Sequence, residues 1–424
     1  MVISEDLTPG YRIPGLIPDR VRAQAAYGVA IPRVLKFFED ERLLVLQDLG
    51  AQMETLDFWI YPSNTSTTEP PPSLETCGSV GTRLGNILAS IHCDPTLLLK
   101  SRTLADDGRL LFENPDTKNF MRTEIVRKVF PLLRPWIDPG TSRAEKIAKI
   151  ISQDFEHSFL ETLHPSSSPS FNFPQSMFSI GDLWTGSIIA GASPATSSSG
   201  AMTGVKVGLV DWEFASLARI GQDIAQFSAW LYLLSTSSAW SSADPRSRRV
   251  ATAISSASAA GSGRLGSDSG AGIYNGTGVE GGANLVTGET LGWRSAAGTL
   301  MDALLRAYAR KVKEYPNYAW FVDEEYGQRK FKKERLAVIR SIWILFGREV
   351  IYNCVDAYDR FARFLTLDGD GGEDGGEVKI WQREMIEVGC WYVSVAGESP
   401  NEEFEEIVGK ECVLRRMYAV AGCL

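Results

Sequence analysis

Two short acidic motifs are the parts of this sequence best suited to catalysis. Gly181-Asp182 and Asp211-Trp-Glu213 each follow a short apolar run. One carboxylate can orient a hydroxyl group for attack on a phosphate. A second carboxylate, at a nearby strand end, can hold the metal ion that neutralises the phosphate charge. The two motifs together therefore indicate a site for phosphoryl transfer.

Each motif taken alone also has a purely structural interpretation. A Gly-Asp pair after a strand is most often a turn, and Asp211-Trp-Glu213 resembles a strand end with exposed acidic side chains. The three histidines, His92, His157 and His164, are more typical of helix surfaces or of the core than of catalytic bases. Only the two motifs together and in this order therefore indicate a site for phosphoryl transfer.

Short apolar runs around the motifs predict the strands that position them. Ser179-Ile180 leads into the Gly181-Asp182 turn, residues 187–190 form a second run, and residues 205–210 form a third that ends at Asp211. The intervening segment 192–204 is rich in Ser, Ala, Gly and Thr, which favours an enlarged hairpin loop. A helix is expected from Gln222 to Leu234.

The rest of the chain is predicted to be mostly helical, so the expected fold class is α+β. Residues 32–47 contain two β-rich runs joined by a charged turn, which predicts a hairpin. Apolar residues at spacings of three and four predict an amphipathic helix from Cys77 to His92. Further helices are expected over 119–137, 141–163, 293–315, 332–364, 378–392 and 401–420.

One long segment lacks this periodicity. Residues 235–292 are dominated by Ser, Gly and Ala. So few large apolar side chains cannot offset the entropy lost when a chain becomes ordered. We therefore expect a disordered insertion at about 235–292.

Composition excludes several classes of protein. The 424 residues carry a net charge of −9, so no overall basic field exists to attract nucleic acid or an anionic membrane. Six cysteines without a Cys-x-x-Cys pair and three histidines argue against a zinc site or a disulfide framework. Neither a signal peptide nor an apolar run of about 18 residues is present. The prediction is a soluble, cytoplasmic protein with no membrane partner.

Three segments in order resemble the aminoglycoside phosphotransferase-like family, which includes choline kinase and methylthioribose kinase. They are Gly181-Asp-Leu-Trp-Thr-Gly-Ser187, Leu209-Val-Asp-Trp-Glu-Phe214 and Gln222-Asp-Ile-Ala225. In addition, Leu44–Gly50 is similar to the strand that leads into the interlobe hinge of that family, and Leu84–His92 to the helix after it. The resemblance extends over residues 30–235.

The resemblance implies a protein-kinase-like bilobal fold. Residues 1–50 would form a truncated N-lobe with the hairpin and the hinge strand, and residues 51–424 a large helical C-lobe that carries both acidic motifs. Two departures stand out: Ile180 replaces the usual histidine, and no glycine-rich loop or Val-Ala-Ile-Lys-like strand precedes the hairpin. These departures leave open that the sequence lacks its true first segment.

The resemblance also implies roles for individual residues. Asp182 would be the catalytic carboxylate, while Asp211 and Glu213 would bind Mg²⁺. The hinge residues Gln47 and Leu49, together with Ser187 in place of the usual asparagine, would bind the nucleotide. Asp223 would be structural and would accept hydrogen bonds from the backbone of the catalytic loop, and Trp184 and Trp212 would be packing residues.

The implied function is the transfer of a phosphoryl group from ATP, with magnesium, to a hydroxyl group of a small molecule. The alternative is a catalytically inactive kinase-like protein that binds a small ligand or a protein partner through the same cleft. The missing lysine strand favours the alternative because transfer requires the phosphates to be held as well as the metal. The sequence does not identify the acceptor.

Overall fold

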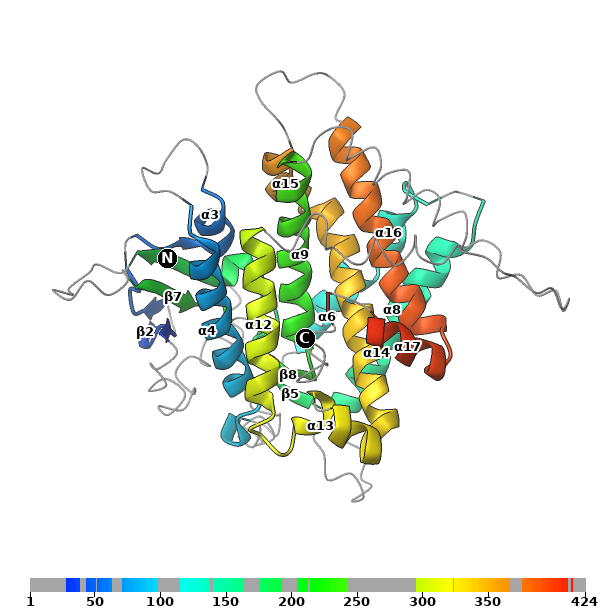
Figure 1. Cartoon of the computed structure of the whole chain (residues 1–424), viewed down its shortest axis with the longest axis horizontal. Helices are drawn as coiled ribbons and strands as arrows, with labels where there is room; N and C mark the ends of the chain where they lie inside the picture. The colour runs from blue at the N-terminus through cyan, green and yellow to red at the C-terminus, as the bar shows by residue number, and fades with distance from the viewer. Residues whose placement is uncertain are drawn as a thin grey trace, which may run out of the picture.

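The computed structural model of the protein describes residues 28–38, 43–50, 52–62, 71–97, 115–137, 140–163, 176–192, 204–212, 214–242, 295–322, 324–365, 376–410 and 413–414. Within these ranges the protein combines several small sheets with a larger helical body, as expected for the α+β class (Figure 1).

The largest sheet has four short strands in the order β1-β7-β6-β4. They are β1 (Val29–Ala30), β4 (Glu54–Thr55), β6 (Ile188–Ala192) and β7 (Val205–Leu209). Strands β6 and β7 form an antiparallel hairpin, and β1 pairs with β7 in parallel. The N-terminal segment is therefore hydrogen-bonded to the strand that delivers the second acidic motif.

The predicted N-terminal hairpin is confirmed. Strands β2 (Val34–Phe38) and β3 (Leu43–Leu46) pair antiparallel, with one register shift between Val34 and Lys36. The Gln47 N–H continues the pairing beyond β3 by donating to the Arg33 carbonyl at 2.8 Å. The hairpin thus leads directly into the segment predicted to be the hinge.

A second two-stranded sheet was not fully anticipated. Strand β5 (Ser176–Ser179) pairs antiparallel with β8 (Ser216–Arg219), and Ser179 lies opposite Ser216. The run that contains β8 has no clear alternation of polar and apolar residues, because both faces of this sheet are largely buried. The pairing brings the residues just before Gly181 close to those just after Phe214.

Long helices form the body of the molecule. In Figure 1, α4, α12, α9, α14 and α16 stand side by side, with β2 and β7 at the α4 end of the row and β5 and β8 below its middle. Their bounds are α4 (Leu74–His92), α9 (Gln222–Ser242), α12 (Ala296–Val312), α14 (Glu324–Asp356) and α16 (Gly376–Glu398). The others are α3 (Leu56–Ile60), α6 (Pro115–Phe120), α7 (Val129–Leu133), α8 (Arg143–Leu163), α13 (Ala319–Val322), α15 (Tyr358–Leu365) and α17 (Asn401–Lys410).

Helices α4 and α12 approach each other unusually closely. A Cβ atom on Gly81 would lie 2.2 Å from the Leu300 carbonyl oxygen, and one on Gly85 would lie 2.3 Å from that of Leu304. Both distances are far below van der Waals contact, so only glycine fits at these two positions. The contact places the C-terminal end of α4 against α12.

Several helix boundaries differ from the sequence predictions. Residues 119–137 do not form one helix, because a π-helical turn at Met121–Val126 separates α6 from α7. Helix α9 continues to Ser242, so residues 235–242 of the predicted insertion are helical. The remainder of that insertion lies outside the described residues. Within the described ranges, no helix has the length and apolar character needed to cross a membrane.

Candidate functional site

The segment Gly181–Ser187, which the sequence predicts to be a catalytic loop and which keeps that name below, forms a tight loop between β5 and β6. Gly181 has a φ of +92°, a conformation that side chains disfavour. A Cβ atom there would also lie 2.0 Å from the Phe214 carbonyl oxygen. Glycine is therefore required at the start of the loop for two independent reasons.

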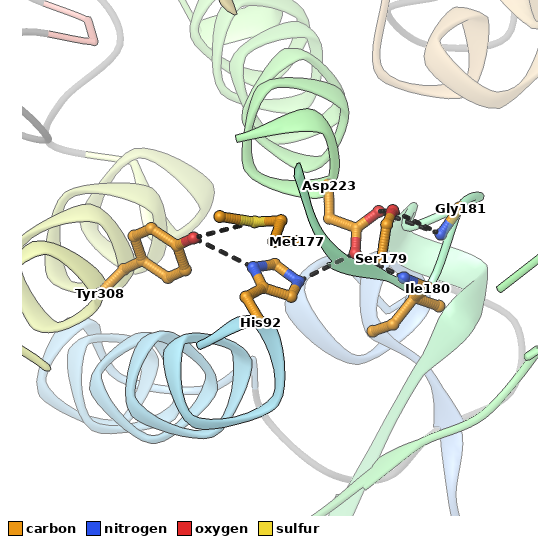
Figure 2. Close-up of polar contacts among 7 residues, drawn as sticks. All are labelled: His92, Met177, Ser179, Ile180, Gly181, Asp223 and Tyr308. Atoms are coloured by element: carbon orange, nitrogen blue, oxygen red, sulfur yellow. Dashed lines mark hydrogen bonds and ion pairs between the residues drawn. The ribbon is translucent and has the colours of Figure 1, made fainter. Parts of the chain in front are cut away.

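Asp223, at the start of α9, holds the beginning of the loop (Figure 2). Its carboxylate accepts hydrogen bonds from the Ser179 hydroxyl at 2.6 Å, the Ile180 N–H at 2.7 Å and the Gly181 N–H at 3.0 Å. The predicted structural role of Asp223 is confirmed by these contacts. The buried Ile180 side chain does not prevent them.

His92, the last residue of α4, approaches Asp223 from the other side. Its Nε2 lies 2.9 Å from Asp223 Oδ2, and its Nδ1 lies 3.0 Å from the Tyr308 hydroxyl of α12. The Tyr308 hydroxyl in turn contacts the Met177 sulfur at 3.8 Å. Figure 2 shows these side chains as one chain of contacts from α12 to the loop. His92 is fully buried, as expected for a structural rather than a catalytic histidine.

The buried network lowers the pKa of the Asp223 carboxyl. Burial by itself raises this pKa, but the hydrogen bond and charge of His92 and the hydrogen bonds from Ser179 and Ile180 lower it below 3.8. The carboxylate is thus the stable form, and it is the form that can accept all of these hydrogen bonds.

Asp182 occupies a different environment within the same loop. It is only half-buried, and its Oδ1 accepts a hydrogen bond of 2.7 Å from Nε2 of Gln226 on α9. Sequence reasoning did not identify Gln226. Its position three residues after Asp223 on the predicted helix was the available signal, because such residues share one helix face.

Ser187 closes the catalytic loop. It is fully buried, and its hydroxyl donates to the Asp182 carbonyl at 2.8 Å. Its own carbonyl accepts from the Val210 N–H at 2.9 Å. This last bond places the end of β7 beside the end of the loop. A direct contact between Ser187 and a nucleotide remains a prediction.

Asp211 is the first residue past that hydrogen bond. It is half-buried and has a φ of +66°, the only positive φ at a non-glycine residue among those described. Strained backbone of this kind clusters at functional sites. The two acidic motifs predicted from the sequence are therefore brought to the same end of the β6–β7 hairpin.

The structure describes Asp211, one of the two predicted magnesium ligands. Mg²⁺ in phosphate-transfer sites is held by one or two carboxylates, with phosphates and water as the other ligands. A half-buried Asp211 carboxylate meets that requirement, whereas Glu213 lies outside the described residues. The described part of the chain has no cluster of three or more metal-ligating His, Cys, Asp or Glu residues.

The predicted hinge lies next to β7. The Leu49 carbonyl accepts a hydrogen bond from the Lys206 ammonium group, and the Leu49 side chain packs over Gly208. Leu49 is buried, while Gln47 is exposed. The predicted hinge is thus fastened to β7, which ends two residues before Asp211. Nucleotide binding by Gln47 and Leu49 stays a prediction.

Both tryptophans of the motifs are packing residues, as predicted. The Trp212 indole is buried and donates to the Leu209 carbonyl at 3.2 Å. The Trp184 ring packs on Trp230 at a centroid distance of 5.3 Å, and the Arg360 guanidinium lies 4.2 Å from the Trp184 ring centre.

Comparison with known proteins adds no relative to this description. No protein-family model matches the sequence, and no curated protein matches it significantly.

Proposed function

We propose that this protein transfers the γ-phosphoryl group of ATP, with magnesium, to a hydroxyl group of a small molecule. The observation that carries the proposal is the Val210–Ser187 hydrogen bond, which puts Asp182 and Asp211 at one end of the β6–β7 hairpin. The proposal includes a cytoplasmic location and no nucleic-acid partner.

The two carboxylates would have separate roles. Asp182 would orient the acceptor hydroxyl and take its proton, an effect worth about 10²–10⁴-fold in rate for general bases. Asp211 would hold the magnesium ion, which supplies positive charge to the phosphates when bound. Because the buried network fixes the loop, Asp182 needs little rearrangement before reaction.

The proposed fold is the bilobal arrangement of the protein-kinase-like proteins. The helical body would be the C-lobe, while β2, β3 and the hinge would belong to a short N-lobe. Support comes from the hinge contact between Leu49 and Lys206. The nucleotide would lie between this hinge and Asp211.

The decisive experiment compares Asp182→Asn with the wild-type protein. Phosphate release from Mg-ATP is measured with water as the acceptor, and then with a panel of small alcohols, sugars and amino alcohols. We expect Asp182→Asn to lower turnover at least about 100-fold. Asp302→Asn, in a partly exposed helix pair with Arg306, is the matched control and should keep wild-type turnover. Equal turnover in Asp182→Asn and wild type would end the assignment.

Binding without turnover is the second candidate function. Ser187 favours it, because the hydroxyl that replaces the usual asparagine amide is engaged by the Asp182 carbonyl. Calorimetry with Mg-ATP separates the two. Nucleotide binding together with turnover that depends on Asp182 supports the enzyme, whereas binding with no turnover for any acceptor supports this second function.

A further inference from the structure

We infer that Gln226 is a positioning residue for Asp182, an inference that rests on the proposed phosphoryl transfer. Its side-chain amide donates to Asp182 Oδ1 at 2.7 Å. Gln226 comes from α9, far from the loop in sequence, and is only 3% exposed. Most side-chain hydrogen bonds go to the backbone or to water, so a bond between a buried amide and a half-buried carboxylate is less common.

Helix α9 holds the catalytic loop at two levels. Asp223 binds the backbone at Ile180 and Gly181, and Gln226, one turn later, binds the side chain of Asp182. Residues three apart lie on the same helix face. Helix α9 therefore sets both the position of the loop and the orientation of the Asp182 carboxylate.

The hydrogen bond matters for the orientation of the Asp182 carboxylate, because the distribution of the terminal χ2 torsion of aspartate is broad and roughly two-fold. The amide N–H of Gln226 restricts the rotation by engaging Oδ1. An amide also suits this task chemically, because it cannot take up the proton that Asp182 would accept from a hydroxyl group.

The test replaces Gln226 with methionine in the full chain. Methionine keeps the length and flexibility of the side chain but removes the donor. We measure kcat and KM for Mg-ATP, with water as the acceptor, together with the melting temperature. The expected result is a fall in kcat of about 10- to 100-fold with KM for ATP within about twofold of wild type. If Gln226 only filled space, its replacement would lower the melting temperature but leave kcat unchanged.

Gln382→Met is the matched control. Gln382 is 7% exposed, and its amide donates to the Cys354 carbonyl at 3.0 Å, between α16 and α14. The control should show a similar drop in melting temperature with an unchanged kcat. If Gln226→Met does not fold, the near-isosteric Gln226→Glu makes the same test. Its kcat should fall further, because a carboxylate would then face a carboxylate.

The possible failures are distinguishable. Turnover that disappears in Asp182→Asn but stays at the Gln382→Met level in Gln226→Met overturns the role of Gln226 and leaves the proposed function intact. Wild-type protein without turnover, or turnover unaffected by Asp182→Asn, overturns both. A kcat-specific loss in Gln226→Met, absent from Gln382→Met, supports the inference.

Discussion

Two sets of aspartates next to the catalytic loop lie in different environments. At the start of the loop, Asp223 is fully enclosed by His92, Ser179 and two backbone N–H groups. Asp182, the next residue of the loop, and Asp211, just after β7, form the second set and are only half-buried. Asp223 is closed off from solvent, whereas Asp182 and Asp211 are each partly exposed.

Burial, rather than residue type, distinguishes these two sets of carboxylates. A carboxylate enclosed by donors is held in one state and stabilises structure. A carboxylate near the surface can exchange partners, as a base or a metal ligand must. Substitutions on the buried side should therefore act on stability first, and those on the half-buried side should act on turnover first.

The largest expected effect comes from removing the buried carboxylate. Asp223→Ala leaves His92 and the loop N–H groups without their acceptor, and breaking a buried pair of this kind costs about 3–5 kcal/mol. Urea unfolding measures the loss. Asp302→Ala, in the partly exposed pair with Arg306, is the control and should cost about 0.5 kcal/mol. Similar losses in the two variants would contradict the distinction between the two sides.

Gly181→Ala should have the next largest effect. Its positive φ and the 2.0 Å approach to the Phe214 carbonyl oxygen both oppose a Cβ atom. Together the backbone strain and the overlap should lower the free energy of unfolding by about 2–4 kcal/mol. Gly140→Ala is a suitable control, because a Cβ atom there would meet nothing within 4 Å. A Gly181→Ala protein as stable as Gly140→Ala would show that the loop can relax.

A smaller effect is expected from acid. The pKa of Asp223 lies below 3.8 in the folded protein, owing to His92, Ser179 and Ile180 acting against burial. A lowered carboxyl pKa stabilises the protein above pH 3.8, and that contribution is lost as the pH falls through the lowered value. Unfolding free energies measured from about pH 5 down to about pH 3 should therefore fall less steeply in Asp223→Asn than in wild type. Parallel curves would refute this assignment.

The smallest expected stability difference concerns Asp211. Asparagine tolerates the left-handed conformation found here at a φ of +66°, whereas alanine does so less well. Asp211→Ala should be about 1 kcal/mol less stable than Asp211→Asn. Both variants should lose magnesium-dependent turnover, because neither retains the carboxylate. If Asp211→Asn kept full turnover, Asp211 would be removed from the metal site.

The sequence predicted those parts of the site that depend on local patterns. The β2–β3 hairpin, strand β7 and the bracing role of Asp223 follow from short motifs and apolar runs. Strand β8 and the partnership of Gln226 with Asp182 did not follow, because both depend on contacts between segments distant in sequence. Helix α9 extends into a Ser-rich segment because packing against other helices overrides weak helix propensity.

The glycine contact between α4 and α12 has a consequence for how function would be lost. A Cβ atom on Gly85 would also lie 2.8 Å from the Tyr308 nitrogen, and Tyr308 binds the histidine that holds Asp223. Any residue larger than glycine would push the two helices apart. Tyr308 would then move away from His92, which holds Asp223. A mutational screen for the proposed activity would therefore find Gly85 together with Asp182, although Gly85 lies in a contact between two helices.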